Sequence, residues 1–317
     1  MAAWPGRDRR PNEAERRVAI TWLWIPVTIA AALAQTVRNA TQRHLTGDLG
    51  TLGATLVRFL YGLPFAIVWL ALFVGLSGER LPALGGGFVL WTLVGGGTQI
   101  VATALLLRVL AMRNFAIGVA YSKTEVVQVA IFGFLLLGET VSPPVALSIA
   151  LAALGVMLVA APSWTGILRG LGSASALLGL ASGGCFAVSA VGYRAAALAL
   201  APGRPALAAA CTLVFAQLVQ SVILGGYLQL RAPRVVEAVC RAWRISLVAG
   251  FMGALASGCW FTAMALEPVA HVRTLGLVEL LFSYAVSRRI FRERLAVREL
   301  CGMGLLLIGM LGVTAAL

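Results

Sequence analysis

Long apolar stretches, separated by short polar breaks, follow one another along almost the whole chain. A helix needs about 20 predominantly apolar residues to cross a bilayer, and these stretches are close to that length. The pattern therefore predicts an all-α membrane protein with about ten transmembrane helices. They are expected at residues 18–37, 49–76, 87–107, 115–137, 141–161, 174–193, 205–230, 245–266, 269–290 and 296–316.

Composition supports this interpretation. Hydrophobic residues make up 60% of the 317 residues, charged residues 12%, and the mean hydropathy is +0.92. Soluble domains carry about 25% charged residues. The net charge of +13 could indicate nucleic-acid binding, but the arginines cluster at 1–17, 231–244 and 288–298, next to the ends of predicted helices. At helix ends, arginines bind anionic lipid head groups and help to set the orientation of the helices in the membrane. The lipid bilayer is therefore the expected partner, and nucleic acid is not.

The sequence lacks motifs of enzymes and of metal sites. It contains neither His-Glu-x-x-His nor Gly-x-Ser-x-Gly, has only His44 and His271, and has five cysteines without Cys-x-x-Cys spacing. We therefore expect no catalytic residues, no cofactor and no metal. The N-terminal helix at 18–37 has a basic start and an Ala32-Leu33-Ala34 that mimics a signal-peptide cleavage site. Its near-full membrane length predicts that it stays attached.

A shift of 154 positions reveals an internal repeat, because it pairs Glu125 with Glu279, Glu139 with Glu293 and Gly155 with Gly309. Each half then holds five predicted helices. Since five is an odd number, the second half must be inverted relative to the first, as in many secondary transporters. The expected organisation is a basic tail at 1–17, a first repeat at 18–161, a connecting loop at 162–173 and a second repeat at 174–317.

Three segments carry a resemblance to a known family. They are "LVRFLYGLPFAIVWLALF" in the second predicted helix, "LLLGETVSPP" leading into "LGVMLVA", and the echo "IFRERLAVRELCGMGLLLIGMLGV" near the end. With them the chain resembles EamA-type transporters of the drug/metabolite transporter superfamily. The resemblance implies a ten-helix secondary carrier in the bacterial inner (cell) membrane, with a central cavity between its halves. Such a carrier moves small metabolites, such as amino acids, without ATP, and export is favoured over import.

The chain departs from the small multidrug members of that superfamily, which carry an acidic residue in the first helix. Here Gln35, Arg38 and Asn39 occupy that region, so a proton mechanism cannot be transferred from them. The alternative to a carrier is a non-transporting membrane scaffold or assembly partner. That alternative explains the hydrophobicity but leaves the polar residues inside the predicted helices without a role.

Glu125 and Glu279 are the strongest functional candidates because each lies about ten residues into a predicted helix, near the middle of the bilayer. A charge at that depth costs about 3 kcal/mol and should face a cavity or a partner. Arg58 is the expected partner. Protons are the candidate coupling ion, and Glu279 is expected to be protonated more readily because its half lacks an arginine at similar depth. Glu139 and Glu293, at helix junctions, are interpreted as structural.

Other polar side chains within the predicted helices are expected to line the cavity wall. They are Gln35, Asn39, Gln99, Tyr121, Gln128, Gln217, Gln220 and Trp260. Tyr121, Glu125 and Gln128 are spaced four and three residues apart, so they share one helical face. That face is the preferred substrate-facing surface. Lys123 is expected to point away from it.

Overall fold

The structure is a computed structural model, and it describes residues 22–110, 112, 121–160, 172–282 and 297–316. The regular structure in these residues is helical, which confirms the predicted all-α class. The helices are α2 (Trp24–Leu60), α3 (Leu63–Ser77), α4 (Gly86–Leu110), α6 (Glu125–Leu137), α7 (Pro143–Ala160), α9 (Ala174–Leu200), α10 (Pro205–Arg231), α11 (Pro233–Arg241), α12 (Trp243–Leu266), α13 (Val269–Leu275) and α15 (Val297–Ala315).

Six helical segments of the described residues are long and apolar enough to cross a membrane: Leu45–Ser77, Gly86–Leu106, Ala174–Leu200, Pro205–Arg231, Trp243–Leu266 and Val297–Ala315. Two shorter apolar helices cover Glu125–Leu137 and Pro143–Val159. Large apolar side chains point outward from these helices, for example Leu72 at 58% and Leu311 at 66% exposure. Large exposed apolar surfaces are uncommon on soluble monomers. Together these features indicate a multi-pass membrane protein.

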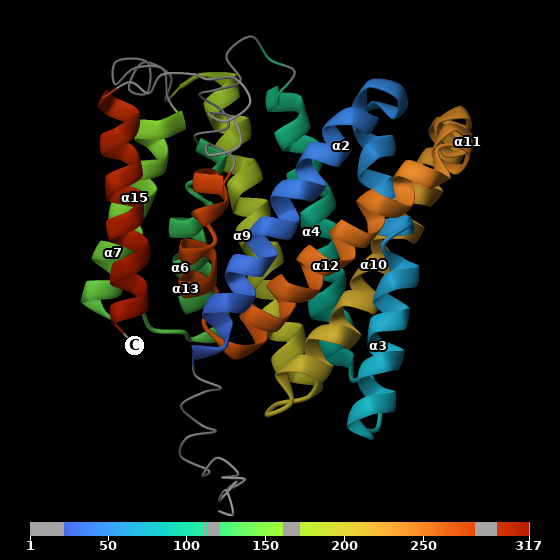
Figure 1. The fold of residues 1–317 in the computed structure, drawn as a ribbon, viewed down its shortest axis with the longest axis horizontal. Helices are drawn as coiled ribbons and strands as arrows, with labels where there is room; N and C mark the ends of the chain where they lie inside the picture. The colour runs from blue at the N-terminus through green and yellow to red at the C-terminus, as the bar shows by residue number, and fades with distance from the viewer. Residues whose placement is uncertain (1–21, 111, 113–120, 161–171, 283–296, 317) are drawn as a thin grey trace, which may run out of the picture.

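The helices lie alongside one another in a bundle (Figure 1). In this view α7 and α15 form one edge and α3, α10 and α11 form the other, with α2, α4, α9 and α12 between them. Helix α2 bends sharply at Gly50, whose φ of 66° favours glycine. The chain turns back at this bend, so α2 contains both the first predicted helix and the start of the second.

Small residues allow the closest helix contacts. A methyl group built on Gly155 of α7 would lie 2.6 Å from the carbonyl oxygen of Gly302 on α15. One built on Gly309 would lie 2.5 Å from the carbonyl oxygen of Ser148 on α7. Both distances are shorter than carbon–oxygen contact allows, so the two backbones touch here without side chains between them. The partner's number falls along α15 as the number rises along α7, so the two helices are antiparallel.

The junction between α6 and α7 is fastened by an ion pair between Glu139 and Arg194 of α9. Arg194 also donates hydrogen bonds to the carbonyl oxygens of Met264 (2.5 Å) and Glu267 (2.6 Å) at the end of α12. Glu139 therefore helps to hold together three segments of the bundle, in keeping with the structural interpretation of this residue. Its predicted counterpart, Glu293, lies outside the described residues.

Candidate functional site

Two helices are interrupted next to the glutamates that the repeat pairs. Residues 123–124 form a turn before α6, and residues 276–277 form a turn after α13, before helical residues 278–282. In the first turn Thr124 N donates to the Tyr121 carbonyl at 3.1 Å, and in the second Leu277 N donates to the Thr274 carbonyl at 3.2 Å. Each of these hydrogen bonds joins residues three apart in sequence, whereas an α-helical hydrogen bond joins residues four apart. Such tight turns inside a helix often mark functional positions.

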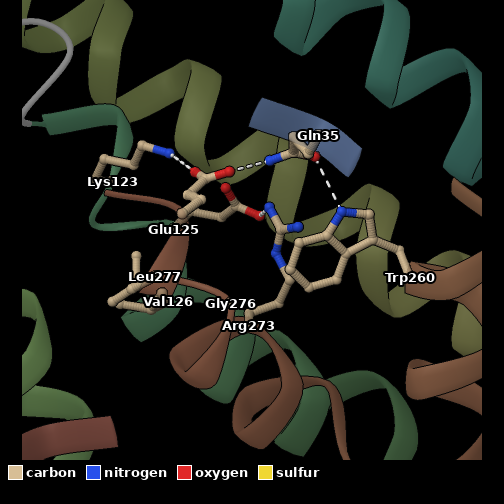
Figure 2. A pocket seen from close by; sticks show the side chains of 9 residues that line it. Gln35, Lys123, Glu125, Val126, Trp260, Arg273, Gly276 and Leu277 are labelled. Carbon is tan, nitrogen blue, oxygen red and sulfur yellow. Dashed lines mark hydrogen bonds and ion pairs between the residues drawn. The ribbon is translucent and has the colours of Figure 1, made fainter. Parts of the chain in front are cut away.

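Ion pairs cross between the two interrupted helices. Lys123 Nζ, from the first turn, lies 2.5 Å from Glu279 Oε1 beyond the second. Arg273, on α13, pairs in return with Glu125 at the start of α6. Figure 2 shows Lys123, Glu125 and Arg273 converging on this cluster. Each carboxylate is therefore neutralised by a cation from the other half of the chain.

Gln35 connects this cluster to two further helices. Its amide nitrogen donates to Glu279 Oε2, and its amide oxygen accepts a 3.0 Å hydrogen bond from Trp260 Nε1 (Figure 2). The Arg273 guanidinium lies over the indole ring, 5.0 Å from its centroid, in a cation–π contact. Gln35 on α2 therefore holds the carboxylate of Glu279, and Trp260 on α12 holds the cation of Arg273.

A cavity of about 180 Å³ opens beside the ion pairs. It is smaller than the roughly 300–1,000 Å³ pockets that hold drug-sized ligands. Both halves of the chain contribute to its wall. The lining residues are Gln35, Arg38, Arg58, Gln99, Leu106, Lys123, Glu125, Phe186, Ser189, Ala190, Tyr193, Ser257, Trp260, Phe261, Met264, Arg273 and Glu279.

One wall of the cavity is held by a hydrogen-bond network across three helices. Gln99 Oε1 on α4 accepts from the Tyr193 hydroxyl of α9 at 3.0 Å and from Gln220 Nε2 of α10 at 2.6 Å. Gln220 Nε2 also lies 3.1 Å from the Tyr193 hydroxyl. These bonds satisfy polar groups that would otherwise be costly to bury, and they fix Gln99 at the cavity edge.

A larger hollow of about 480 Å³ lies between α6 and α7, but its chemistry differs. Apart from Thr140, its lining consists of apolar residues, among them Ile131, Phe134 and Leu135, whose side chains are all more than a third exposed. We interpret it as a lipid-facing groove. The charged cavity is therefore the candidate functional site.

Six of the predicted site residues meet at this cavity, namely Gln35, Arg58, Gln99, Glu125, Trp260 and Glu279. Among the described residues, the predicted side chains that are not part of the cavity wall are Tyr121, Gln128, Gln217 and Gln220. Tyr121 packs against Ala176, Gln128 hydrogen-bonds Thr124 Oγ1 at 3.0 Å, and Gln217 is buried next to Gly62. The side chain of Asn39 lies outside the described part of the chain.

Of the predicted face of Tyr121, Glu125 and Gln128, only Glu125 lines the cavity among the described residues, although Gln128 lies on the same unbroken helix, α6. The turn at residues 123–124 interrupts the helix between Tyr121 and Glu125. Spacings of three and four residues place side chains on one face only along an unbroken helix. The same turn corrects the prediction for Lys123, which points toward Glu279 instead of away from the site.

The predicted partner of the glutamates is also wrong. Glu125 pairs with Arg273 and Glu279 with Lys123, whereas Arg58 donates a 3.4 Å hydrogen bond to Ser257 Oγ. The expectation that Glu279 lacks a nearby cation fails for the same reason. Arg58 nevertheless lines the cavity.

Sequence reasoning missed Arg38, Arg273 and Tyr193 as cavity residues. A signal existed for the two arginines, since each is a charge near or within a predicted apolar helix, where charges are rare and usually functional. Lys123 carried the same signal, being the one lysine in the sequence. Tyr193 had no such signal, because a tyrosine in an apolar helix is ordinary.

Comparison with known proteins informs the fold. No protein-family model and no curated protein matches the chain. A solved crystal structure, described only as that of a protein, aligns with 92% of this chain and 98% of its own chain. The TM-score is 0.68 and the sequence identity is 16%. At this identity the likeness concerns the fold alone, which this chain shares with that structure over nearly its whole length.

Proposed function

We propose that this protein is a secondary transporter that carries small metabolites, such as amino acids or related compounds, across the bacterial inner membrane. It resembles the EamA-type drug/metabolite transporters, and it works by alternating access around the charged cavity without ATP. Export is the favoured direction. The observation that carries the proposal is a charged cavity inside an apolar bundle, bordered by two interrupted helices. Interrupted helices near the bilayer midplane form the binding sites of many secondary transporters.

The proposed architecture is ten helices in two inverted five-helix repeats. Contacts between α7 and α15 support it, because the 154-residue shift maps one contact onto the other. Gly155 approaches Gly302, and the counterparts of these residues, Gly309 and Ser148, approach each other. The two helices are antiparallel, as an inverted repeat requires. The shift also maps the turn at 123–124 to within one residue of the turn at 276–277.

A scaffold or assembly partner is a weaker explanation. Charged groups inside a membrane protein are expensive and are retained mainly where they serve a pathway or a site. A scaffold would need only dry helix contacts in its interior, such as that between α7 and α15. It would have no use for six charged side chains around a cavity.

Transport can be tested with the purified protein in liposomes that contain no ATP. The liposomes are loaded with a mixture of amino acids and small organic acids, and release is followed by mass spectrometry. At least one compound should leave faster than from protein-free liposomes. Glu279→Gln should lower that rate at least tenfold because it replaces the carboxylate bound by Lys123 and Gln35.

Glu237→Gln is the matched control, because Glu237 is a solvent-exposed carboxylate on α11, paired with Arg241. This variant should transport like the parent. An imposed pH gradient then tests protons as the coupling ion, since a coupled carrier changes rate with the gradient. Release no faster than from protein-free liposomes, for every compound, would contradict the proposed function.

A further inference from the structure

The charges around the cavity do not balance. Its lining includes four cationic side chains, Arg38, Arg58, Lys123 and Arg273, and two carboxylates, Glu125 and Glu279. Four minus two leaves an excess of two positive charges. Both carboxylates already contact a cation, Lys123 in one case and Arg273 in the other. Among the described residues, the cavity therefore offers positive charge to a ligand and no uncommitted negative charge.

Arg58 is the best placed of the cationic groups to meet a ligand. Its hydrogen bond to Ser257 Oγ is long, at 3.4 Å. Within the described part of the chain, no carboxylate lies within 4 Å of its guanidinium. A guanidinium has five N–H donors in a planar fork that matches a carboxylate in two parallel hydrogen bonds. A bound anion would both use these donors and offset the partly buried charge.

The remainder of the cavity wall is largely apolar and aromatic. Phe186 and Tyr193 come from α9, and Trp260, Phe261 and Met264 come from α12. The Tyr193 and Phe261 rings pack together, with centroids 4.3 Å apart. Such a wall favours an apolar group on the ligand, and a volume of about 180 Å³ restricts that group to a compact one.

We propose that the cavity binds a small organic acid in its ionised form, with the carboxylate on Arg58 and the apolar body against α9 and α12. This inference rests on the proposed transport function and deepens it by naming the substrate class. It also sets a preference. Glu125 is engaged by Arg273 and Glu279 by Lys123, so an amine finds no free carboxylate among the described lining residues. Organic acids are therefore bound in preference to amines and neutral compounds.

Isothermal titration calorimetry of the parent protein in detergent at neutral pH tests the charge preference directly. Benzoate, benzyl alcohol and benzylamine have similar size and differ in charge, being anionic, neutral and cationic. We expect benzoate to bind at least tenfold more tightly than either of the others. The inference is overturned if benzylamine or benzyl alcohol binds as tightly as benzoate, or if none of the three binds.

Variants of Arg58 then test the assigned residue. Arg58→Gln should weaken benzoate binding at least tenfold, whereas Arg58→Lys, which keeps the charge but loses the fork, should fall between it and the parent. Arg241→Gln removes an exposed arginine on α11 and should bind like the parent. A change of less than twofold in Arg58→Gln would overturn the role of Arg58. If that variant does not fold, the lysine variant and the probe series still decide the question.

The binding and release experiments distinguish failure of the anion site from failure of the proposed transport function. Selective benzoate binding without release of any compound from liposomes would contradict the carrier and leave the anion site in place. Release of amines or neutral compounds but not of organic acids would support the carrier and overturn the anion preference. Both measurements use the full chain.

Discussion

Lys123 and Arg273 each neutralise a glutamate that belongs to the other half of the chain. Their contacts, 156 and 148 residues apart in sequence, join the two interrupted helices at the cavity wall. Removing one member of a buried ion pair leaves an uncompensated charge, which is far more destabilising than removing both. The crossed pairs should therefore couple the stability of the two halves to the integrity of the site.

The Lys123–Glu279 pair provides the test at this scale. Lys123→Met should lower the free energy of unfolding by about 3 kcal/mol because Glu279 is left with a partly buried, uncompensated charge. Adding Glu279→Gln should restore most of that loss. Denaturant unfolding in detergent micelles measures both values. A double variant no more stable than Lys123→Met would contradict the coupling.

The surface pair Arg241–Glu237 is the control for this experiment. Its side chains are 77% and 60% exposed, whereas those of Lys123 and Glu279 are 26% and 12% exposed. Exposed pairs contribute about 0–1 kcal/mol. Arg241→Met should therefore change the free energy of unfolding by less than about 1 kcal/mol.

At the scale of elements, two kinds of local sequence feature shape the bundle. Turns at 123–124 and 276–277 interrupt helices and direct their charged side chains toward each other. Glycines elsewhere bring intact helices into backbone contact, most closely between α7 and α15. In lipid, where helices gain nothing from burying apolar surface against each other, such close contact is a main source of association.

Gly155 and Gly309 should be equally intolerant of a side chain. Gly155→Val and Gly309→Val place a carbon within 2.6 Å and 2.5 Å of a facing carbonyl oxygen. Overpacking of this kind costs about 1–3 kcal/mol, so both variants should unfold at lower temperature. Circular dichroism during heating in detergent measures the midpoint.

Gly304 on α15 is the control for these substitutions, because a methyl group built there would meet nothing within 4 Å. Gly304→Val should keep the parent's midpoint. If the unfolding midpoint fell equally for all three valine variants, helix propensity would explain the effect, and contact between α7 and α15 would not.

At the scale of the whole molecule, the connections gather at two ends of the bundle. Arg204, between α9 and α10, lies 3.7 Å from Glu79, between α3 and α4, so these two connections share one end. Helix α11 lies at the other end in Figure 1. If the bundle crosses the membrane, the first end and α11 must face opposite compartments.

Labelling with a membrane-impermeant maleimide tests this arrangement. Cys240 is exposed on α11, and Arg80→Cys would add a thiol beside Glu79. In a background with the remaining cysteines changed to serine, Cys240 should react from one side of the membrane and the new thiol from the other. Sealed vesicles of both orientations provide the measurement. Reaction of both thiols from the same side would contradict the arrangement.

The sequence by itself determined the helical class and the approximate position of the helices. Apolar length is a local property, and a chain with 12% charged residues has few other ways to bury its backbone polar groups in lipid. The depth of Glu125 and Glu279 in their predicted helices likewise indicated an interior site. Gln35 and Trp260 were recognisable as candidates because polar groups within such helices are uncommon.

Only the tertiary structure decided which charges meet. Depth along a helix suggested Arg58 as the partner of the glutamates, but depth does not determine the direction of a side chain, and Lys123 and Arg273 take that place. The turn at 123–124 removed the regular spacing on which the predicted shared face of Tyr121 and Glu125 depended. Helical periodicity is local, whereas an ion pair between segments about 150 residues apart depends on how the halves pack.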